Sequence, residues 1–325
     1  MHSACMLRLQ DGRFRNLHPH RTHGYWDLLR WKLRLGPKER AVVDRSILPE
    51  FRPEWRPADL ERISRPDRSR IQLTWIGHTT FLIQVAGMNF LTDPVFGSHC
   101  GPFPLPSLRR RAPLPLRLEQ LPPIHAVLLS HNHYDHLEEK TARRLGREVL
   151  WMVPLGNAAW FKQRSLDNVV ELDWWQEAEL GPLTLVSVPA QHFSARTPFD
   201  RNLTLWCGHV LRTPLGNIYF AGDSGYAPLF SDIGRHLGPM RLSLLPIGAY
   251  QPRWFMAPIH MNPEEAVRAH IDVRSELSVG THWGTFQLTD EPLAEPPIAL
   301  RHALARRHLP ATQFRTLRIG ETILV

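Results

Sequence analysis

Short apolar runs recur along the chain, and most of them end in a glycine or in a polar residue. Apolar and polar positions alternate in 71–76, and two further runs follow at 81–85 and 88–91, separated by the turn Ala86-Gly87. A period of two residues is typical of β-strands, so these runs predict a β-meander. Later runs predict strands at 126–130, 149–153, 169–172, 183–188, 203–212, 218–220, 242–247 and 277–280, and a terminal strand pair within 314–325.

Helical patterns lie between these strands. The clearest one starts at Asn262, a good N-cap, with Pro263 at the first helical position and Glu265 three residues after the cap. We therefore expect a helix from 263 to 272. Other helices are expected at 25–35, 137–146, 158–164 and 298–308. Strands that alternate with helices indicate an α/β fold.

The first 70 residues differ from the rest, because they are dense in arginine, proline and aromatic residues. We therefore divide the chain into an N-terminal arm, 1–70, and a main domain, 71–325. The expected helix at 25–35 ends at Gly36-Pro37 and has apolar residues on two opposite sides. Three interpretations of this arm stay open: packing on the main domain, contact with a second subunit, and contact with lipid.

Length and cysteine content bound the class of protein. A chain of 325 residues is long enough for one large domain or two small ones. No apolar run approaches about 18 residues, and residues 1–10 lack the apolar core of a secretory signal. Cys5, Cys100 and Cys207 are far apart and form no Cys-x-x-Cys pair, so neither a disulfide framework nor a thiolate zinc site is expected. We expect a cytoplasmic protein.

The formal net charge of +8 comes almost entirely from arginine. Arginine suits phosphate recognition, so nucleic acid, an anionic membrane and a phosphorylated substrate are all compatible partners, and a compositional bias without function is the alternative. The long irregular segment 97–123 carries Arg109-Arg110-Arg111. This segment either covers the active site, binds anionic headgroups or is a solvated basic loop.

Four side chains that can bind a metal gather within six residues. They are His131, His133, Asp135 and His136, between the strand 126–130 and the helix 137–146. A loop between a strand and a helix is a usual place for chemistry, and imidazole and carboxylate are good zinc ligands. A polar surface turn that is rich in histidine is the alternative.

His192, Asp223 and His282 each stand directly after an apolar strand. Together with the loop they supply five histidines and two aspartates, enough for two metals if one carboxylate bridges them. Two such cations could bind a phosphoryl oxygen and generate hydroxide near neutral pH. Asp93, at a strand end, is expected to support the site or to cap a turn. For His78 we favour structural packing.

These residues are similar to the ligand set of the metallo-β-lactamase superfamily. Within it, longer motifs resemble the N-acyl-phosphatidylethanolamine-hydrolysing phospholipase D family: SHNHYDHL at 130–137, FAGD at 220–223, PIGAY at 246–250, PRWFM at 252–256 and HWGTF at 282–286. The likeness extends from about residue 13 to about residue 305.

The resemblance implies an α/β fold, the four-layer αβ/βα sandwich with two central mixed β-sheets. It also implies two Zn²⁺ per chain. One zinc would be held by His131, His133 and His192, the second by Asp135, His136 and His282, with Asp223 as the bridge. The implied reaction releases N-acylethanolamine and phosphatidic acid from a membrane phospholipid. The implied protein is a homodimer, associated peripherally with an anionic membrane at its inner face, with a hydrophobic cavity above the site.

On this basis we expect a metal-bridged hydroxide to attack phosphorus, with Asp135 as both ligand and proton acceptor and Asp223 as the second catalytic carboxylate. Substrate contacts are expected from Gln191, Arg253, Trp254, Phe255, Met256 and His260: an acyl groove from 254–256, phosphate contact from Arg253, and substrate or ligand support from Gln191 and His260. Plain core packing is the alternative for 253–256.

Other functions stay open. The same metals could serve a hydrolase that acts on another phosphodiester, a lactone or a thioester. A basic nuclease is less favoured, because no low-complexity basic segment with interleaved aromatic residues supplies an RNA-binding arm, and we expect no nucleic acid partner. A non-catalytic metal-binding protein is a further alternative, against which the complete ligand set argues.

Overall fold

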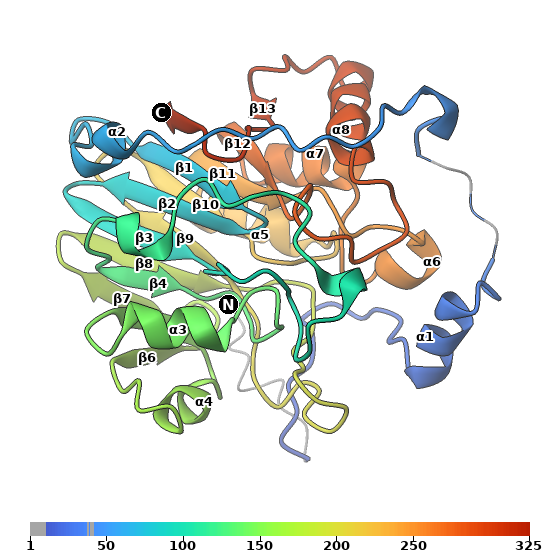
Figure 1. The fold of residues 1–325 in the computed structure, drawn as a ribbon, viewed down its shortest axis with the longest axis horizontal. Helices are drawn as coiled ribbons and strands as arrows, with labels where there is room; N and C mark the ends of the chain where they lie inside the picture. The colour runs from blue at the N-terminus through green and yellow to red at the C-terminus, as the bar shows by residue number, and fades with distance from the viewer. Residues whose placement is uncertain (1–10, 38, 40–41) are drawn as a thin grey trace.

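The computed structural model describes residues 11–37, 39 and 42–325, and in this part of the chain two seven-stranded mixed sheets pack face to face (Figure 1). The expectation that residues 1–10 contain no secretory signal lies outside these residues, as does Cys5. Cys100 and Cys207 are buried and free. No helix among the described residues is long and apolar enough to span a bilayer.

The first sheet has the strand order β14-β1-β2-β3-β4-β5-β6. The predicted meander is its antiparallel half, and the strands from β3 to β6 run parallel. Its strands are β1 (Gln72–Gly77), β2 (Thr80–Val85), β3 (Met88–Thr92), β4 (Ala126–Leu128), β5 (Leu150–Pro154), β6 (Val169–Leu172) and β14 (Thr322–Leu324).

The second sheet has the order β13-β12-β11-β10-β9-β8-β7 and the same division into antiparallel and parallel halves. Because strands alternate the face to which side chains point, both sheets contribute apolar residues to one central core between them. Its strands are β7 (Glu177–Leu180), β8 (Leu183–Val188), β9 (Gly208–Arg212), β10 (Asn217–Phe220), β11 (Met240–Pro246), β12 (Ser275–Thr281) and β13 (Phe314–Arg315).

Helices cover both outer faces, which completes four layers (Figure 1). One apolar cluster joins the first sheet to α3 and α4, and another joins the second sheet to α5, α7 and α8. This is the metallo-β-lactamase fold, as predicted. The helices are α1 (Tyr25–Lys32), α2 (Leu60–Ser64), α3 (Glu139–Leu145), α4 (Ala158–Lys162), α5 (Leu229–Leu237), α6 (Arg253–Met256), α7 (Pro263–Asp272) and α8 (Glu295–Arg306), with 3-10 turns at Arg45–Ile47, Pro106–Leu108 and Leu118–Gln120.

The capping box predicted for α7 is present. Oδ1 of Asn262 accepts from the backbone N–H of Glu265 at 2.9 Å, and the Glu265 carboxylate accepts from the N–H of Asn262 at 2.9 Å. The helix ends at Asp272, where we expected it to end.

Three predictions about elements were wrong. The terminal strands do not pair with each other: β13 joins β12 in the second sheet, and β14 joins β1 in the first. The strand expected at 203–212 begins only at Gly208, because the backbone of Leu205 and Cys207 bonds instead to Leu155 and Ser130. The helix expected at 25–35 ends at Lys32, and Arg34 has a φ of +57°, which no α-helix continues.

The basic triplet in the loop 97–123 is only partly available to a partner. Arg110 donates to the backbone oxygens of Val95 and Gly97, at 2.7 and 2.9 Å, and its guanidinium lies 4.9 Å from the centre of the Phe286 ring. Arg110 therefore fixes the loop against the body of the protein instead of binding a headgroup.

Candidate metal centre

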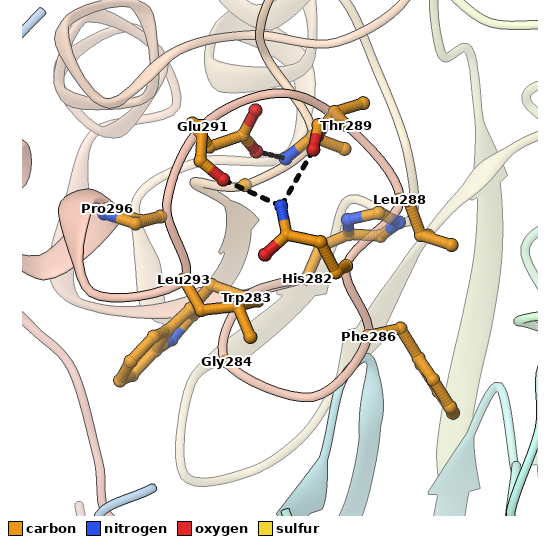
Figure 2. A pocket seen from close by; sticks show the side chains of 12 residues that line it. His282, Trp283, Gly284, Phe286, Leu288, Thr289, Glu291, Leu293 and Pro296 are labelled. Atoms are coloured by element: carbon orange, nitrogen blue, oxygen red, sulfur yellow. Dashed lines mark hydrogen bonds between the residues drawn. The ribbon is translucent and has the colours of Figure 1, made fainter. Parts of the chain in front are cut away.

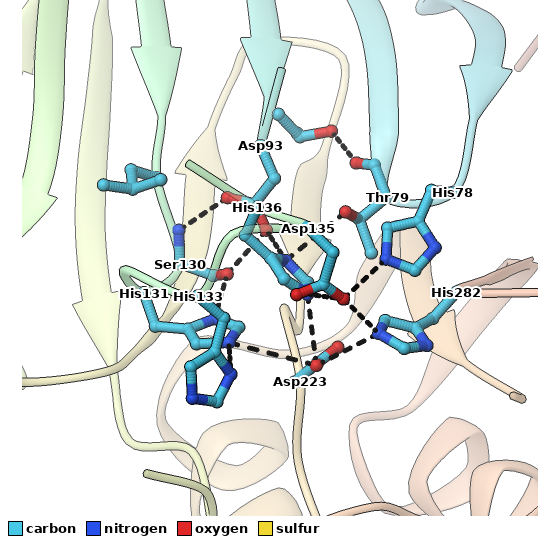
Figure 3. Close-up of polar contacts among 12 residues, drawn as sticks. His78, Thr79, Asp93, Ser130, His131, His133, Asp135, His136, Asp223 and His282 are labelled. Atoms are coloured by element: carbon cyan, nitrogen blue, oxygen red, sulfur yellow. Dashed lines mark hydrogen bonds and ion pairs between the residues drawn. The ribbon is translucent and has the colours of Figure 1, made fainter. Parts of the chain in front are cut away.

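The seven predicted ligands come together at one edge of the sandwich, where strands of both sheets end. Figure 3 labels all of them except His192. The loop after β4 supplies His131, His133, Asp135 and His136. The second sheet supplies the other three, from positions just beyond its strands: His192 after β8, Asp223 after β10 and His282 after β12. The site therefore lies on the seam between the two sheets.

His131, His133 and His192 form one group whose ring nitrogens converge. Nε2 of His131 lies 2.8 Å, and Nε2 of His192 3.4 Å, from Nδ1 of His133. The opposite nitrogen of His192 donates to the carbonyl oxygen of Ile259 at 2.8 Å, which leaves its Nε2 with a lone pair directed into the group. Three convergent lone pairs are the arrangement that a tetrahedral metal requires.

A second group contains Asp135, His136 and His282, with His78 as a further member. Oδ2 of Asp135 lies 3.4 Å from Nε2 of His136 and 3.4 Å from Nε2 of His282. Asp223 lies between the two groups, because its Oδ2 is 3.2 Å from the Nε2 atoms of both His136 and His282, and 3.8 and 4.0 Å from those of His192 and His131. One carboxylate oxygen thus faces both groups.

The donor atoms fit a cation. Nε2 of His136, Nε2 of His282 and Oδ1 of Asp223 are buried and make no hydrogen bond, and the two nitrogens face the Asp223 carboxylate only as ion pairs at 3.2 Å. Buried polar atoms without partners are costly, and their convergence indicates that a ligand completes them. The donor set of imidazole and carboxylate suits zinc.

The electrostatics of the two groups differ. Burial lowers the pKa of His133 to about 3 and that of His192 to about 4, so both rings are neutral and offer lone pairs. Burial also lowers the pKa of His282, but Asp223 and Asp135 raise it to about 9. In the second group a metal therefore competes with a proton, and metal binding releases it.

A buried carboxylate behind the site orients two of the histidines (Figure 3). Oδ2 of Asp93 lies 2.6 Å from Nδ1 of His136, and Asp93 also accepts from the Ser130 backbone N–H and hydroxyl, at 2.7 and 2.6 Å. Because the Ser130 hydroxyl hydrogen is used in this way, its oxygen accepts from Nδ1 of His131 at 2.9 Å. Asp93 thereby directs Nε2 of both rings at the site, the supporting role predicted for it.

Backbone strain is concentrated here. His78, Asp93 and His282 have φ values of +55°, +31° and +61°. Positive φ is uncommon outside glycine, and clusters of such residues often mark functional sites. Gly222 precedes Asp223 with a φ of +60°, and a Cβ there would lie 2.4 Å from the Cβ of Ser130. Glycine therefore lets the Asp223 loop approach the His131 loop.

Two histidines belong to the site although the sequence left their roles open. His78, for which packing was favoured, has Nε2 3.0 Å from Oδ2 of Asp135. His260 groups with His192 and Asp223, and its Nδ1 is buried without a partner. Asn16, from the arm, was not predicted at all: its amide makes two hydrogen bonds with the backbone of His192, at 2.8 and 3.0 Å. Its isolated position in the sequence gave no signal.

Arg196 holds the loop at 131–137, called the metal loop below, by hydrogen bonds to its backbone. Its guanidinium donates to the carbonyl oxygens of Asn132 and Leu137, both at 2.8 Å, and lies 3.9 Å from the centre of the Tyr134 ring. One side chain therefore holds both ends of the loop that carries four of the candidate ligands.

The segment after His282 folds back around a small pocket that His282 helps to line (Figure 2). Nε2 of Gln287 donates to the carbonyl oxygens of Thr289 and Glu291. The Glu291 carboxylate in turn accepts from the backbone of Ala249 and Gln251, at 2.6 and 3.0 Å. The loop therefore ties the end of β12 to the loop after β11.

A largely apolar cavity of about 800 Å³ lies against the metal groups, and His133, Asp135, Asp223, His260 and His282 are part of its lining. We call it the apolar cavity. Its walls come from α1, from the segment 193–201 and from α6 with the residues that follow it, and include Leu28, Trp31, Phe193, Phe255, Met256, Ile259 and Leu288.

The cavity separates the predicted substrate contacts into two sets. Phe255, Met256 and His260 line it, whereas Gln191, Arg253 and Trp254 do not. Arg253 instead pairs with Glu265 at 2.8 Å and donates to the carbonyl oxygen of His260 at 2.8 Å, so it positions His260. Trp254 packs beside Gly36 of the arm, and Gln191 is buried. In this structure the guanidinium of Arg253 is thus held by Glu265 and by the backbone of His260, and its contact with a phosphate stays a prediction.

Comparison with known proteins agrees with the geometry. A model of the β-lactamase superfamily domain matches residues 88–283. An uncharacterized protein of Mycobacterium tuberculosis is 41% identical over 310 residues, which cover 92% of this chain and 80% of that protein. The N-acyl-phosphatidylethanolamine-hydrolyzing phospholipase D 1 of Caenorhabditis elegans is 35% identical over 316 residues, 92% of this chain and 87% of the relative.

Two solved structures share the fold. The isothiocyanate hydrolase from Delia radicum gut bacteria superposes with a TM-score of 0.65 at 24% identity, covering 78% of this chain and 98% of that one. The metallo-β-lactamase fold protein YhfI from Bacillus subtilis superposes with a TM-score of 0.54 at 15% identity, covering 79% and 100%. At these identities the likeness establishes the architecture alone.

Proposed function

Because this chain belongs to the metallo-β-lactamase superfamily, we propose that it is a zinc-dependent phosphodiesterase of the phospholipase D type. The proposed substrate is N-acyl-phosphatidylethanolamine, and the products are N-acylethanolamine and phosphatidic acid. The similarity to the Caenorhabditis elegans enzyme over most of both chains supports this choice within the superfamily.

One observation carries the proposal: the apolar cavity is lined on one part of its surface by the convergent histidines and aspartates. A lipid has long apolar chains next to a charged phosphodiester. A cavity lined by apolar side chains together with a gathered set of polar groups is complementary to such a molecule. The walls would also exclude water from the reacting group, which strengthens electrostatic interactions there.

We assign the proposed ligands by group. His131, His133 and His192 would hold one cation, Asp135, His136 and His282 the other, and Asp223 would contact both. Two divalent cations held there would supply a nucleophile near neutral pH and neutralise negative charge on a phosphoryl group. Asp93 and Ser130 would keep His136 and His131 in the required orientation.

The protein's own groups would bind and orient the substrate. Phe255 and Met256 would contact the acyl chains, and His260 would lie beside the phosphodiester, where Arg253 fixes its backbone. Asp135, whose Oδ2 lies within 3.4 Å of three histidine nitrogens, is the proposed proton acceptor.

We also propose that the arm, residues 1–70, touches a membrane surface and that 71–325 are the hydrolase domain. Tyr25 and Trp26 are 73% and 74% exposed on α1, and Tyr25 lines the apolar cavity together with Leu28 and Trp31 of the same helix. Aromatic residues beside a lipid-sized opening suit the interface of a bilayer. Contact of the arm with a second subunit stays a prediction.

The test is product analysis by mass spectrometry after incubation of the zinc-loaded protein with N-acyl-phosphatidylethanolamine. Asp223→Asn is the inactive variant, and Asp167→Asn, a change at an exposed position, is the control. We expect N-acylethanolamine and phosphatidic acid from the unmutated protein and the control only. Hydrolysis of a generic phosphodiester, a lactone or a thioester instead, again dependent on Asp223, would retain the metal centre and reject the lipid.

A further inference from the structure

Arg201 places a cationic group in the wall of the apolar cavity. It follows the segment that leaves the site after His192, and its guanidinium lies 4.4 Å from the centre of the Phe193 ring. A guanidinium stacked on an aromatic face gains a cation–π interaction but makes no hydrogen bond through it. Its hydrogen-bonding edge therefore stays available.

The charge of Arg201 is not neutralised within the part of the chain that the structure describes. One terminal nitrogen donates to the carbonyl oxygen of His23 at 3.2 Å, and Nε is buried without a partner. Burial lowers the pKa of Arg201, with no opposing contribution from a carboxylate. Burial lowers the pKa of His20 as well, and the charge of Arg201 lowers it further, as expected of a cation without a counter-ion nearby.

Lys32 also lines the cavity, but its situation differs. It is exposed, and its ammonium group lies 3.9 Å from the centre of the Trp31 ring. Water solvates such a group at no cost. A partly desolvated guanidinium with an unused buried donor is costly, and an anionic ligand would remove that cost.

Arg201 is one aromatic ring away from the metal centre. The Phe193 ring on which it stacks lies 4.5 Å from the His133 ring and 4.9 Å from the His192 ring, measured between ring centres. An anion bound by Arg201 would therefore lie beside a group bound between the metal ligands. The rest of the wall is mostly apolar, so the matching ligand has a charged end and a hydrocarbon end.

We propose that Arg201 binds a phosphate oxygen of an amphipathic ligand whose hydrocarbon chain occupies the apolar cavity. In this role Arg201 makes the site selective for anionic phosphoesters over neutral esters of the same length. The inference rests on the proposed function for the identity of the anion as phosphate. It deepens that function, because selectivity would come from the chain as well as from the metals.

The experiment separates Arg201 from the metals. The metal-free protein is titrated calorimetrically with octyl phosphate and, in parallel, with 1-octanol, which has the same chain and no charge. Three variants are compared with the unmutated chain: Arg201→Gln, Arg201→Lys and, as a control for net charge, Arg30→Gln on the exposed side of α1. Octanol binding reports whether the cavity is intact in each variant.

We expect Arg201→Gln to weaken octyl phosphate binding roughly 10- to 100-fold, the usual effect of losing a charge-assisted hydrogen bond, and to change octanol binding less than about twofold. The affinity of Arg201→Lys for octyl phosphate should lie between those of the unmutated chain and Arg201→Gln, because lysine keeps the charge but lacks the planar guanidinium. Arg30→Gln should bind both ligands like the unmutated chain.

The inference is overturned if Arg201→Gln leaves the ratio of the two affinities unchanged, whether both persist or both are lost together. An equal loss in Arg30→Gln would overturn it too, since the effect would then come from net charge. Failure of the proposed function is a separate result: zinc-loaded protein would not hydrolyse N-acyl-phosphatidylethanolamine, while the dependence of octyl phosphate binding on Arg201 would remain.

Discussion

Asp93 supports the candidate metal centre from behind two of its histidines, His136 and His131. Its carboxylate is fully buried and bonds to His136 and to both polar groups of Ser130. Through Ser130 it also fixes which nitrogen of His131 carries the proton. Hydrogen-bond partners behind a metal ligand raise its basicity and hold its orientation.

Replacing Asp93 with asparagine should weaken zinc binding about 10- to 100-fold, because an amide cannot accept from His136 and Ser130 as a carboxylate does. The measurement is a competition titration of the metal-free protein with zinc and a chromogenic chelator. Asp167→Asn, at an exposed position, is the matched control and should bind zinc normally. Unchanged zinc affinity in Asp93→Asn would show that Asp93 serves packing alone.

His270 gives the protein an acid-sensitive point away from the metals. It is buried on α7, where Nδ1 lies 2.8 Å from the Ser278 hydroxyl, and burial lowers its pKa from 6.5 to about 4. As the pH falls below 6.5 the unfolded chain binds a proton that the folded chain refuses until about pH 4. Stability is therefore lost between these two values, by about 2 kcal/mol at pH 5.

His270→Asn should remove that part of the acid sensitivity. Urea unfolding of the metal-free protein at pH 7.5 and at pH 5 gives the loss of stability for each variant. We expect the loss to be smaller by about 2 kcal/mol in His270→Asn than in the unmutated chain. His302→Asn, at an exposed histidine, should show the full loss. Equal losses in all three proteins would contradict the assignment.

The site residues that the sequence predicted stand in a local sequence pattern, whereas those that it missed do not. Four of the seven candidate ligands cluster within six residues after an apolar run, and each of the other three follows an apolar run of its own, so this pattern was enough to group them. Arg201 and Asn16 act through backbone and ring contacts that depend on how distant loops meet. The pairing of Arg253 with Glu265 across the start of α7 was likewise not foreseen, because it depends on how α6 and α7 meet.

At the scale of elements, local chemistry decided which boundaries could be predicted. The capping residues of α7 set its start without help from the rest of the fold. Helix α5 was missed, although its buried positions have helical spacing. Gly234 lies inside this helix on its buried side, and a Cβ there would lie 1.9 Å from the carbonyl oxygen of Asp272 at the end of α7. That glycine is explained by helix packing, which a single sequence does not display.

Which strands pair with each other was harder to predict than where helices begin. The short β7 carries two glutamates in four residues and was not predicted, because its pairing with β8 outweighs its weak strand propensity. The last two strands lie close in sequence and were expected to pair, yet each extends a different sheet. Adjacency in sequence is only a tendency in sheet topology, and here the sandwich overrides it.

The metal loop is itself an element that needs an external support, and Arg196 provides it. Arg196→Met should loosen the loop, since it removes the bonds to Asn132 and Leu137 and retains much of the side-chain volume. We expect lower zinc affinity and a lower kcat, with Arg196→Lys restoring part of both. Zinc content after dialysis and steady-state kinetics are the measurements.

A purely structural role for Arg196 would give a different pattern. The melting temperature of the metal-free protein would fall, while zinc affinity in the folded fraction stayed normal. Arg164→Met is a suitable control, because Arg164 stacks on Trp160 at 4.0 Å and pairs with Glu139 but makes no bond to the metal loop among the described contacts. The variant Arg164→Met should have the zinc affinity of the unmutated chain.

The whole molecule is a sandwich whose two halves meet at the metal centre. The first sheet holds the ligands on the loop after β4, and the second holds His192, Asp223 and His282. A cation bound by His131 and His192, or by His136 and His282, therefore links one sheet to the other. Metal binding should stabilise the packing of the sheets and not only the loops that carry the ligands.

Removal of metal should accordingly lower the melting temperature of the whole domain. A site saturated at 100 times its dissociation constant contributes about 2.7 kcal/mol, which for a domain of this size corresponds to a shift of several degrees. Calorimetry of zinc-loaded protein, of protein dialysed against a chelator, and of the dialysed protein after zinc is restored measures the shift and its reversibility. The melting temperature of Asp223→Asn should fall less when the chelator is added, because the substitution removes the carboxylate that faces both groups. An identical melting temperature with and without zinc, in protein shown to contain the metal, would mean that the sheets are held by the apolar core alone.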